Sequence, residues 1–483
     1  MNRIKALFAR PKASTGEYEP LADDESGALP GSMSKEATPF SWVEYCIFAL
    51  IGVAMLWAWN MFLAAAPYFQ MRFQSDPWIL ANSQSAILTT STVLNLGSMI
   101  VLTNMQSSAN YPLRIKAALA TNAATFAMLT ISTFSLLDVS PKVYFAFILL
   151  MVALAAMAAG LMQNGAFSFA ASFGRPEYTQ AIMAGQGVAG ILPPLTQMLS
   201  FLAFSDSPST GAPEPGRAGR SNLDSAPDEG GTAAFIYFLT AVLMSVITLA
   251  AFIPLVRRHS RLLKNRAVLG EDASSGPHQN ANNTSGDSDG TPNRYVPITT
   301  LVRKLGWLAG AVSMCFIVTM FFPVFTAKIL SVHDDDNDDD SSNGSGTAPL
   351  FRAGAFIPLA FFFWNLGDLA GRVSTVVPAL SFGLRRHPAV LFCLALARWA
   401  FLPLYLLCNL HGDGAAVPSD LFYLLVVQFP FGLTNGWLGS TAMMAAAEWV
   451  ADDERAAAGA FMSMCLVGGL AVGSVLSFAA AGV

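Results

Sequence analysis

Long apolar runs recur along the whole of this 483-residue sequence, and they limit its folds more than any other feature. Each run holds about 20 mostly apolar residues, which as a helix is the length needed to cross the hydrocarbon core of a bilayer. Apolar residues make up 53% of the chain and charged residues only 12%. Soluble domains carry about 25% charged residues. The sequence therefore predicts an all-α polytopic membrane protein.

Eleven transmembrane helices in a 6+5 arrangement are expected. Their ranges are 42–66, 79–103, 113–136, 142–172, 178–204, 233–256, 305–329, 351–377, 388–410, 420–448 and 455–481. We interpret residues 1–41 as a disordered cytosolic tail, 42–256 as a six-helix bundle, 257–304 as a disordered cytosolic loop rich in Ser, Asn, Gly and Asp, and 305–483 as a five-helix bundle. Two such bundles favour two pseudo-repeated halves around a central cavity.

The Lys and Arg residues predict the orientation. With the N-terminus in the cytosol, the cytosolic side carries roughly three times as many basic residues near the spans as the other side, which satisfies the positive-inside rule. The C-terminus then faces the outside or a lumen. Asn343 begins an Asn-Gly-Ser sequon in an outer acidic loop and is a glycosylation candidate. The sequons at Asn282 and Asn283 lie in the cytosolic loop and should stay unmodified.

The most informative polar residues lie in the eighth span, which reads FFFWNLGDLAGR over residues 361–372. Asn365, Asp368 and Arg372 share one face of a helix. A charge at the membrane centre costs about 2.5–3.5 kcal/mol on insertion scales, so such residues usually serve a pathway or pair with each other. The spacing lets Asp368 and Arg372 meet, and Gly367 with Gly371 forms a GxxxG ridge for a closely packed neighbour.

Arg398, in the ninth span, is a second deep positive charge. Asp368 has three options: it pairs with Arg372 along its own helix, pairs with Arg398 across helices, or alternates between them. A static pair that only holds helices together is an equally weighted interpretation. Asn435, beside Gly436 in the tenth span, marks an expected bend and a packing or gating position.

Other polar positions lie in the first, fourth and fifth spans. Leu56, Trp59 and Asn60 lie on neighbouring helical positions at the end of the first span, where an indole and an amide suit a flat heterocycle. Gln163, near the end of the fourth span, is a ligand contact if a cavity adjoins it and otherwise an interhelical hydrogen-bond partner. The fifth span contains packing glycines, which are Gly185, Gly187 and Gly190.

Several classes of function are not supported. No stripe of basic and aromatic residues indicates nucleic-acid binding. No Cys or His spacing indicates a metal site or a cofactor, and no nucleophile–base constellation or His-Glu-x-x-His motif indicates an enzyme. The acidic run after His333 is interpreted as a solvated loop. Tyr18–Leu21 fits a Tyr-x-x-hydrophobic signal for a sorting adaptor, which would favour a vacuolar or lysosomal address.

Five segments in order resemble the equilibrative nucleoside transporters, and the tail and loops look most like fungal members. The segments are WNMF at Trp59, YTQAIMAGQGVAG at Tyr178, WNLGDLAGR at Trp364, LARWAFLPLYLLCN at Leu396 and TNGWLGS at Thr434. Ala58, where many relatives have Pro, and Trp364, where Phe is common, depart from the family pattern. The resemblance implies eleven helices in a major-facilitator-like arrangement that carries purine and pyrimidine nucleosides such as adenosine and uridine by alternating access, with nucleobases as a further substrate class left open.

The resemblance also implies roles for individual residues. Leu56, Trp59 and Gln163 look like base or sugar contacts, and Asp368 with Arg372 looks like the ribose-side pair, with Asn365 beside it. Three functions remain open at this point. They are facilitative nucleoside transport in a vacuolar, lysosomal or plasma membrane, proton-coupled symport on the same fold with Asp368 titrating, and a non-transporting receptor or scaffold.

Overall fold

The structure is a computed structural model, and it describes residues 40–106, 109–205, 226–272, 295–333, 349–412 and 414–480. The described residues are almost entirely helical, with an isolated β-bridge between Ile329 and Leu410. The predicted all-α class is confirmed. Tyr18–Leu21, Asn282, Asn283 and Asn343 lie outside the described residues, so the sorting and glycosylation predictions stay untested.

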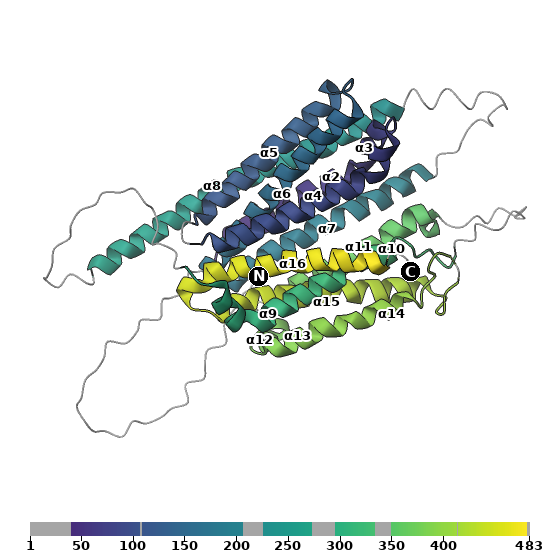
Figure 1. The fold of residues 1–483 in the computed structure, drawn as a ribbon. Coiled ribbons are helices and arrows are strands. Elements are labelled where there is room, and N and C mark those ends of the chain that lie inside the picture. Colours follow the sequence, from purple (N-terminus) through teal and green to yellow (C-terminus); the bar gives the residue numbers. More distant parts are fainter. Residues whose placement is uncertain are drawn as a thin grey trace, which may run out of the picture.

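The helices form two groups that follow the order of the sequence (Figure 1). The first group is α2 (Trp42–Ala64), α3 (Ala66–Phe73), α4 (Pro77–Asn104), α5 (Tyr111–Ser135), α6 (Pro141–Ser172), α7 (Pro176–Ser205) and α8 (Ala226–Asp272). The second group is α9 (Ile298–Thr319), α10 (Phe322–Thr326), α11 (Ala353–Ser374), α12 (Pro378–Arg385), α13 (Pro388–Ala397), α14 (Phe401–Tyr405), α15 (Phe429–Ala445) and α16 (Arg455–Ala480). The second group also contains four short 3-10 helices, η1 (Pro349–Phe351), η2 (Arg398–Ala400), η4 (Ala446–Glu448) and η5 (Asp452–Glu454), and a π-helix, η3 (Phe422–Gln428), that leads into α15.

Local sequence signals set where several helices begin. The Asp76 side chain accepts hydrogen bonds from the backbone N–H groups of Trp78 and Ile79, each at 3.2 Å, and so caps α4. Asn110 caps α5 in the same way through Leu113 N, at 3.0 Å. Proline occupies the first position of α4, α6 and α13, where its missing N–H costs nothing. These signals explain why the expected boundaries agree closely with the observed ones.

Nine helical stretches in the described part of the chain are long and apolar enough to cross a membrane. In this count α2 joins α3, α9 joins α10, α13 joins α14, and η5 joins α16. Two further long stretches, α7 and η3 with α15, are not among those nine and correspond to the fifth and tenth expected spans. The polytopic class is therefore confirmed. The count of eleven spans and the 6+5 division stay predictions.

The ends of the expected central loop differ from the observed helices. Helix α8 continues to Asp272, well past residue 256, and α9 begins at Ile298 rather than near 305. Figure 1 shows α8 extending beyond the other helices at one end of the molecule. The residues after 256 include Leu, Lys, Arg and Ala, which are good helix formers, so the helix persists where the apolar pattern stops.

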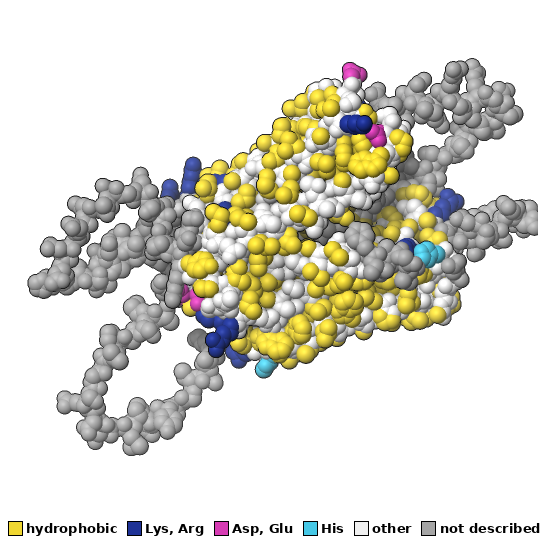
Figure 2. Space-filling view, viewed as in Figure 1, with side chains coloured by type: hydrophobic (Ala, Val, Ile, Leu, Met, Phe, Trp, Pro, Cys, Tyr) yellow, Lys and Arg dark blue, Asp and Glu magenta, His cyan; other side chains and the backbone are white. Residues whose placement is uncertain are grey.

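The outer surface agrees with a lipid environment. Figure 2 shows hydrophobic side chains over the band between the two ends, with Lys and Arg gathered at the ends. Large apolar side chains are widely exposed within that band, including Val475 at 71% and Val93 at 61%. The two halves meet where α7 packs against α11 and where α16 packs against α4 and α6. Apolar side chains exposed to this extent are expected on the surface of a membrane-embedded bundle.

Candidate functional site

A cavity of about 390 Å³ lies between the two halves. Both halves line it: α2, α4, α5, α6 and α7 from the first, and α9, α11 and α16 from the second. Its volume falls within the roughly 300–1,000 Å³ that small-molecule sites usually have. Most of the lining is apolar, and its polar residues are Ser91, Thr92, Asn95, Asn122, Gln163, Gln186, Arg372 and Ser474.

Arg372 borders this cavity and connects the two halves. Its side chain is 7% exposed, and Nε donates to Asp368 Oδ2 at 2.7 Å. Nη1 donates across to α7, to Met183 O at 2.8 Å and to Gln186 Oε1 at 3.2 Å. The backbone carbonyl of Arg372 accepts from Gln180 Nε2 at 3.0 Å, so the same residue is held to α7 twice. The guanidinium therefore belongs both to the cavity wall and to the contact between halves.

Asp368 lies behind Arg372 rather than in the cavity lining. Its residue exposure is 4%, and its two carboxylate oxygens have separate donors. Oδ2 accepts from Arg372 Nε, and Oδ1 accepts from Asn435 Nδ2 on α15 at 2.8 Å. Of the pairings that the sequence leaves open, the structure has Asp368 with Arg372. Its role here is to fix the guanidinium from the side away from the cavity.

Arg398 is 2% exposed and forms no ion pair with Asp368 in the described part of the chain. Nη1 donates to Cys315 O at 2.7 Å and Nη2 to Phe431 O at 3.3 Å, and the guanidinium carbon lies 4.8 Å from the centre of the Phe431 ring. Nη2 also donates to Thr319 Oγ1 at 3.3 Å. All these partners belong to the second half, so Arg398 is an internal structural element of that half.

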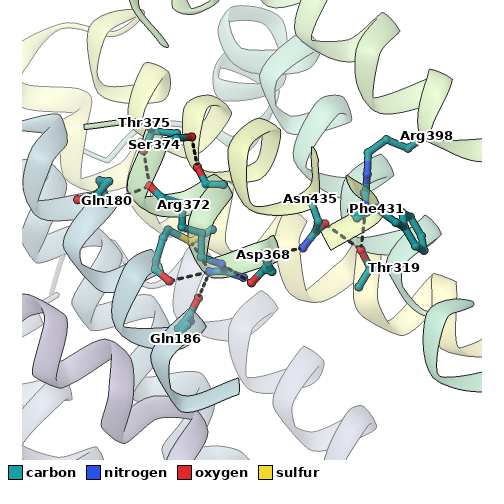
Figure 3. Close-up of polar contacts among 12 residues, drawn as sticks. Gln180, Gln186, Thr319, Asp368, Arg372, Ser374, Thr375, Arg398, Phe431 and Asn435 are labelled. Atoms are coloured by element: carbon teal, nitrogen blue, oxygen red, sulfur yellow. Dashed lines mark hydrogen bonds and ion pairs between the residues drawn. The ribbon is translucent and has the colours of Figure 1, made fainter. Parts of the chain in front are cut away.

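A chain of hydrogen bonds joins the two arginines (Figure 3). The Thr319 hydroxyl accepts from Arg398 and donates to Asn435 Oδ1 at 2.8 Å, while Asn435 Nδ2 donates to Asp368. Asn435 thus uses both ends of its amide. Because each polar group in this series has a partner, the series stabilises one packing of α9, α11 and α15.

Three other predicted contacts also reach the cavity. Leu56 and Trp59 line it from α2, and Gln163 lines it from α6. Trp59 stacks on Phe62, with ring centroids 6.1 Å apart and an interplanar angle of 7°, which fixes the indole at the cavity wall. Gln163 is 7% exposed. The first half therefore contributes an aromatic face and a nearly buried amide to the cavity, and the second half contributes Arg372.

Two predicted contacts lie outside the cavity lining, and both are committed to packing. Asn60 Nδ2 donates to Ala189 O on α7 at 2.9 Å. Asn365 Nδ2 donates to Phe361 O, one turn back on its own helix, at 2.8 Å. The common helical face inferred for Asn365, Asp368 and Arg372 is thus divided: Asn365 faces α7 near Gly190, and Arg372 alone reaches the cavity.

The predicted glycines lie at close contacts between helices. A Cβ on Gly367 would lie 2.2 Å from Phe429 O, and one on Gly371 would lie 2.1 Å from Leu433 O, so α11 and α15 touch backbone to backbone. Gly185 has the same relation to Ala49 O on α2, at 1.9 Å. Gly187 lies beside Arg372 and Leu369, and Gly190 lies beside Asn365. A side chain at the first three positions would separate the helices.

The sequence interpretation missed several polar residues. Gln186 borders the cavity next to Arg372, and Gln180 bonds the Arg372 carbonyl, yet both were treated only as part of a glycine-rich segment. Asn95 and Asn122 also line the cavity. The available signal was an amide inside an apolar span, which is costly unless it is used. In the described residues, no group of three or more His, Cys, Asp or Glu side chains is placed to hold a metal ion.

Comparison with known sequences identifies relatives over nearly the whole chain. The family described as nucleoside transporter matches residues 149–481. The nucleoside transporter FUN26 of Saccharomyces cerevisiae is 30% identical, over 90% of this chain and 83% of its own length. Equilibrative nucleoside transporter 1 of Homo sapiens is 25% identical, over 90% of this chain and 96% of its own length. The resemblance inferred from five segments is thereby confirmed.

Solved structures with the same architecture are major-facilitator proteins. FucP, a Major Facilitator Superfamily transporter in the outward conformation, has a TM-score of 0.54 at 13% identity, over 90% of this chain and 91% of its own. A bacterial homologue of the iron transporter ferroportin, in an outward-facing state, has a TM-score of 0.52 at 11% identity, over 92% of each chain. At these identities the likeness shows the fold alone. The chain belongs to the nucleoside transporter family and has a major-facilitator-like fold.

Proposed function

We propose that this protein carries nucleosides across a membrane by facilitative alternating access. The observation that supports this most directly is the cavity between the halves, which Trp59 and Gln163 line from the first half and Arg372 from the second. A nucleoside is neutral, flat at its base and rich in hydroxyls at its sugar. The indole suits the base, and the guanidinium, held in place by Asp368, suits the ribose oxygens. Adenosine and uridine are the proposed substrates.

The facilitative cycle is favoured over proton coupling. Asp368 pairs with Arg372 and accepts a second hydrogen bond from Asn435, so its position is explained by its anchoring of the guanidinium without a coupling role. A neutral solute also requires no accompanying ion in order to bind. The receptor or scaffold alternative leaves the cavity and its guanidinium without a use.

Uptake into liposomes that contain the purified protein tests this proposal. Labelled adenosine and uridine should enter saturably and stop at equal concentrations inside and outside, with or without an imposed proton gradient. Arg372→Ala and Asp368→Asn should both lose saturable uptake. Arg303→Ala, which removes an exposed guanidinium of α9 outside the cavity, is the matched control and should transport normally. Uphill uptake driven by the gradient would establish symport instead, and absence of saturable uptake in the wild type would refute transport.

We also propose a cytosolic N-terminus and an outer or lumenal C-terminus in a vacuolar, lysosomal or plasma membrane. The distribution of Lys and Arg supports the orientation. In eukaryotic cells, glycosidase treatment should increase the gel mobility of the wild type and leave Asn343→Gln unchanged. Replacing both Asn282 and Asn283 by Gln should have no effect. A glycan at Asn282 or Asn283 would reverse the orientation.

A further inference from the structure

Two asparagines of the first half border the cavity, and their side-chain oxygens have no hydrogen-bond partner in the part of the chain that the structure describes. Asn95 lies on α4 and Asn122 on α5, and both line the cavity. Asn122 is 3% exposed. The Oδ1 atoms of both residues are buried, and neither has a partner among the described residues. A buried amide without a partner costs about 1–3 kcal/mol, so two at one cavity require an explanation.

The part of the cavity that α4, α5 and α6 line, here called the recess, belongs to the first half, whereas Arg372 belongs to the second. Helix α5 packs against α6 and α8 of its own half, so Asn122 lies deep within the first half. Three cavity-lining residues of α6, Ala155, Ala156 and Ala159, have side chains no longer than a methyl group and leave the recess open. The Phe126 ring adds an aromatic wall beside Asn122. An apolar recess of this kind with two amides accepts a flat heterocycle that has polar groups on its edge.

The contrast with two other polar residues of the cavity lining supports this assignment. Arg372 and Gln186 bond each other across the halves. Those groups already have partners before any solute arrives. Asn95 and Asn122 do not. An amide carries both a donor and an acceptor, and rotation about its last side-chain bond presents either one to a ligand.

We propose that Asn95 and Asn122 read the hydrogen-bonding edge of the nucleoside base, which enters the recess while the sugar stays near Arg372. This inference rests on the proposed transport function and specifies how its site selects the base. An adenine edge offers an amino group next to a ring nitrogen, and a side-chain amide pairs with both atoms. A base without an exocyclic group leaves the asparagines unpartnered and is therefore transported less well.

The test compares adenosine with purine riboside, which lacks only the 6-amino group. In liposomes, the wild type should transport adenosine with a kcat/KM about tenfold higher than that of purine riboside, the ratio expected from one or two lost hydrogen bonds. Asn122→Leu and Asn95→Leu remove the amides with little change in volume. Each should bring the ratio close to one, mainly by lowering kcat/KM for adenosine.

Thr125→Val is the matched control, because its hydroxyl is also buried and unpartnered on α5 but does not line the cavity. It should keep the wild-type ratio.

A second measurement avoids dependence on turnover. Adenosine should raise the unfolding temperature of detergent-solubilised wild type more than purine riboside does, and this difference should vanish in both Asn variants. The Leu variants should themselves be at least as stable as the wild type, since they remove an unsatisfied buried group.

Three outcomes would overturn the proposal. The first is equal transport of the two nucleosides by the wild type, and the second is an unchanged tenfold ratio in both Asn variants. In either case nucleoside transport itself stands and only the reading of the base edge is refuted. The third is the absence of saturable uptake of both probes by the wild type, which refutes the transport function on which this inference rests.

Discussion

Two buried arginines of the second half have different surroundings. Arg372 borders the cavity, pairs with Asp368 and reaches α7 of the other half through Met183 and Gln186. Arg398 is more deeply buried and bonds only groups of its own half, according to the described contacts. A charge inside an apolar span therefore does not by itself identify a pathway. The partners of the charge, and the half from which they come, distinguish a functional guanidinium from a structural one.

The largest expected effect is that of Arg372→Ala on transport. The change removes the cavity guanidinium. It also leaves Asp368 as a buried carboxylate without its cation, which costs about 3–5 kcal/mol. Saturable nucleoside uptake should fall at least about a hundredfold, since about 1.4 kcal/mol corresponds to a factor of ten. Initial rates per reconstituted protein provide the measurement. Rates equal to those of Arg303→Ala would remove Arg372 from the pathway.

Arg398→Met should act on stability rather than on transport selectivity. The thioether side chain fills most of the volume. It leaves two backbone carbonyls and two hydroxyls without the hydrogen bonds that Arg398 donates to them, which lowers stability by about 2–4 kcal/mol. The unfolding temperature in detergent should fall, while KM for adenosine in the folded fraction stays at the wild-type value. A tenfold change in KM without a change in stability would place Arg398 in the transport pathway. It would contradict the distinction between a functional Arg372 and a structural Arg398.

Gly371→Ala should lower stability by about 1–3 kcal/mol, because the new methyl group would lie within 2.1 Å of Leu433 O and force α11 away from α15. That displacement also moves Asp368 relative to Asn435, so uptake should fall with stability. Gly439→Ala on α15 is the matched control, since its nearest contact would be an ordinary 3.6 Å to the Phe316 ring. Equal unfolding temperatures for the two variants would contradict this close packing.

The smallest effect is expected for Thr319→Val, which cuts the link between the two arginines. It removes the hydroxyl that connects Arg398 to Asn435, at a cost of about 1 kcal/mol. Uptake kinetics should be unchanged because Asp368 keeps Arg372 and Asn435. A large loss of uptake would mean that the two arginines act as one unit, as the alternating pairing of Asp368 requires.

Much of the fold could be predicted because membrane helices leave strong signals. Apolar length alone located most boundaries to within a few residues, and the caps at Asp76 and Asn110 and the prolines at first helical positions explain that agreement. The extension of α8 to Asp272 could not be found in this way. It lies outside the apolar pattern, and helix propensity alone is a weak guide there.

The site was predicted less completely, for a geometric reason. Helical periodicity places Asn365, Asp368 and Arg372 on one broad face, but it does not tell which part of that face meets a cavity and which meets α7 or α15. It also gives no partner for Arg398, whose acceptors are largely backbone carbonyls that every residue has. Asn95 and Asn122 could have been flagged as amides in apolar spans, but their lack of partners is visible only in three dimensions.

The double attachment of Arg372 to α7 has a consequence for how fast the carrier returns empty. Arg372 borders the cavity, and its Nη1 bonds Met183 O and Gln186, so a solute that accepted a hydrogen bond from Nη1 would compete with this contact between the halves. Such a solute would offset up to one charge-assisted hydrogen bond, about 1.5–3 kcal/mol, of the work needed to part α7 from α11. Without a solute the protein would break that bond unaided, so we expect one-for-one exchange to be faster than net flow.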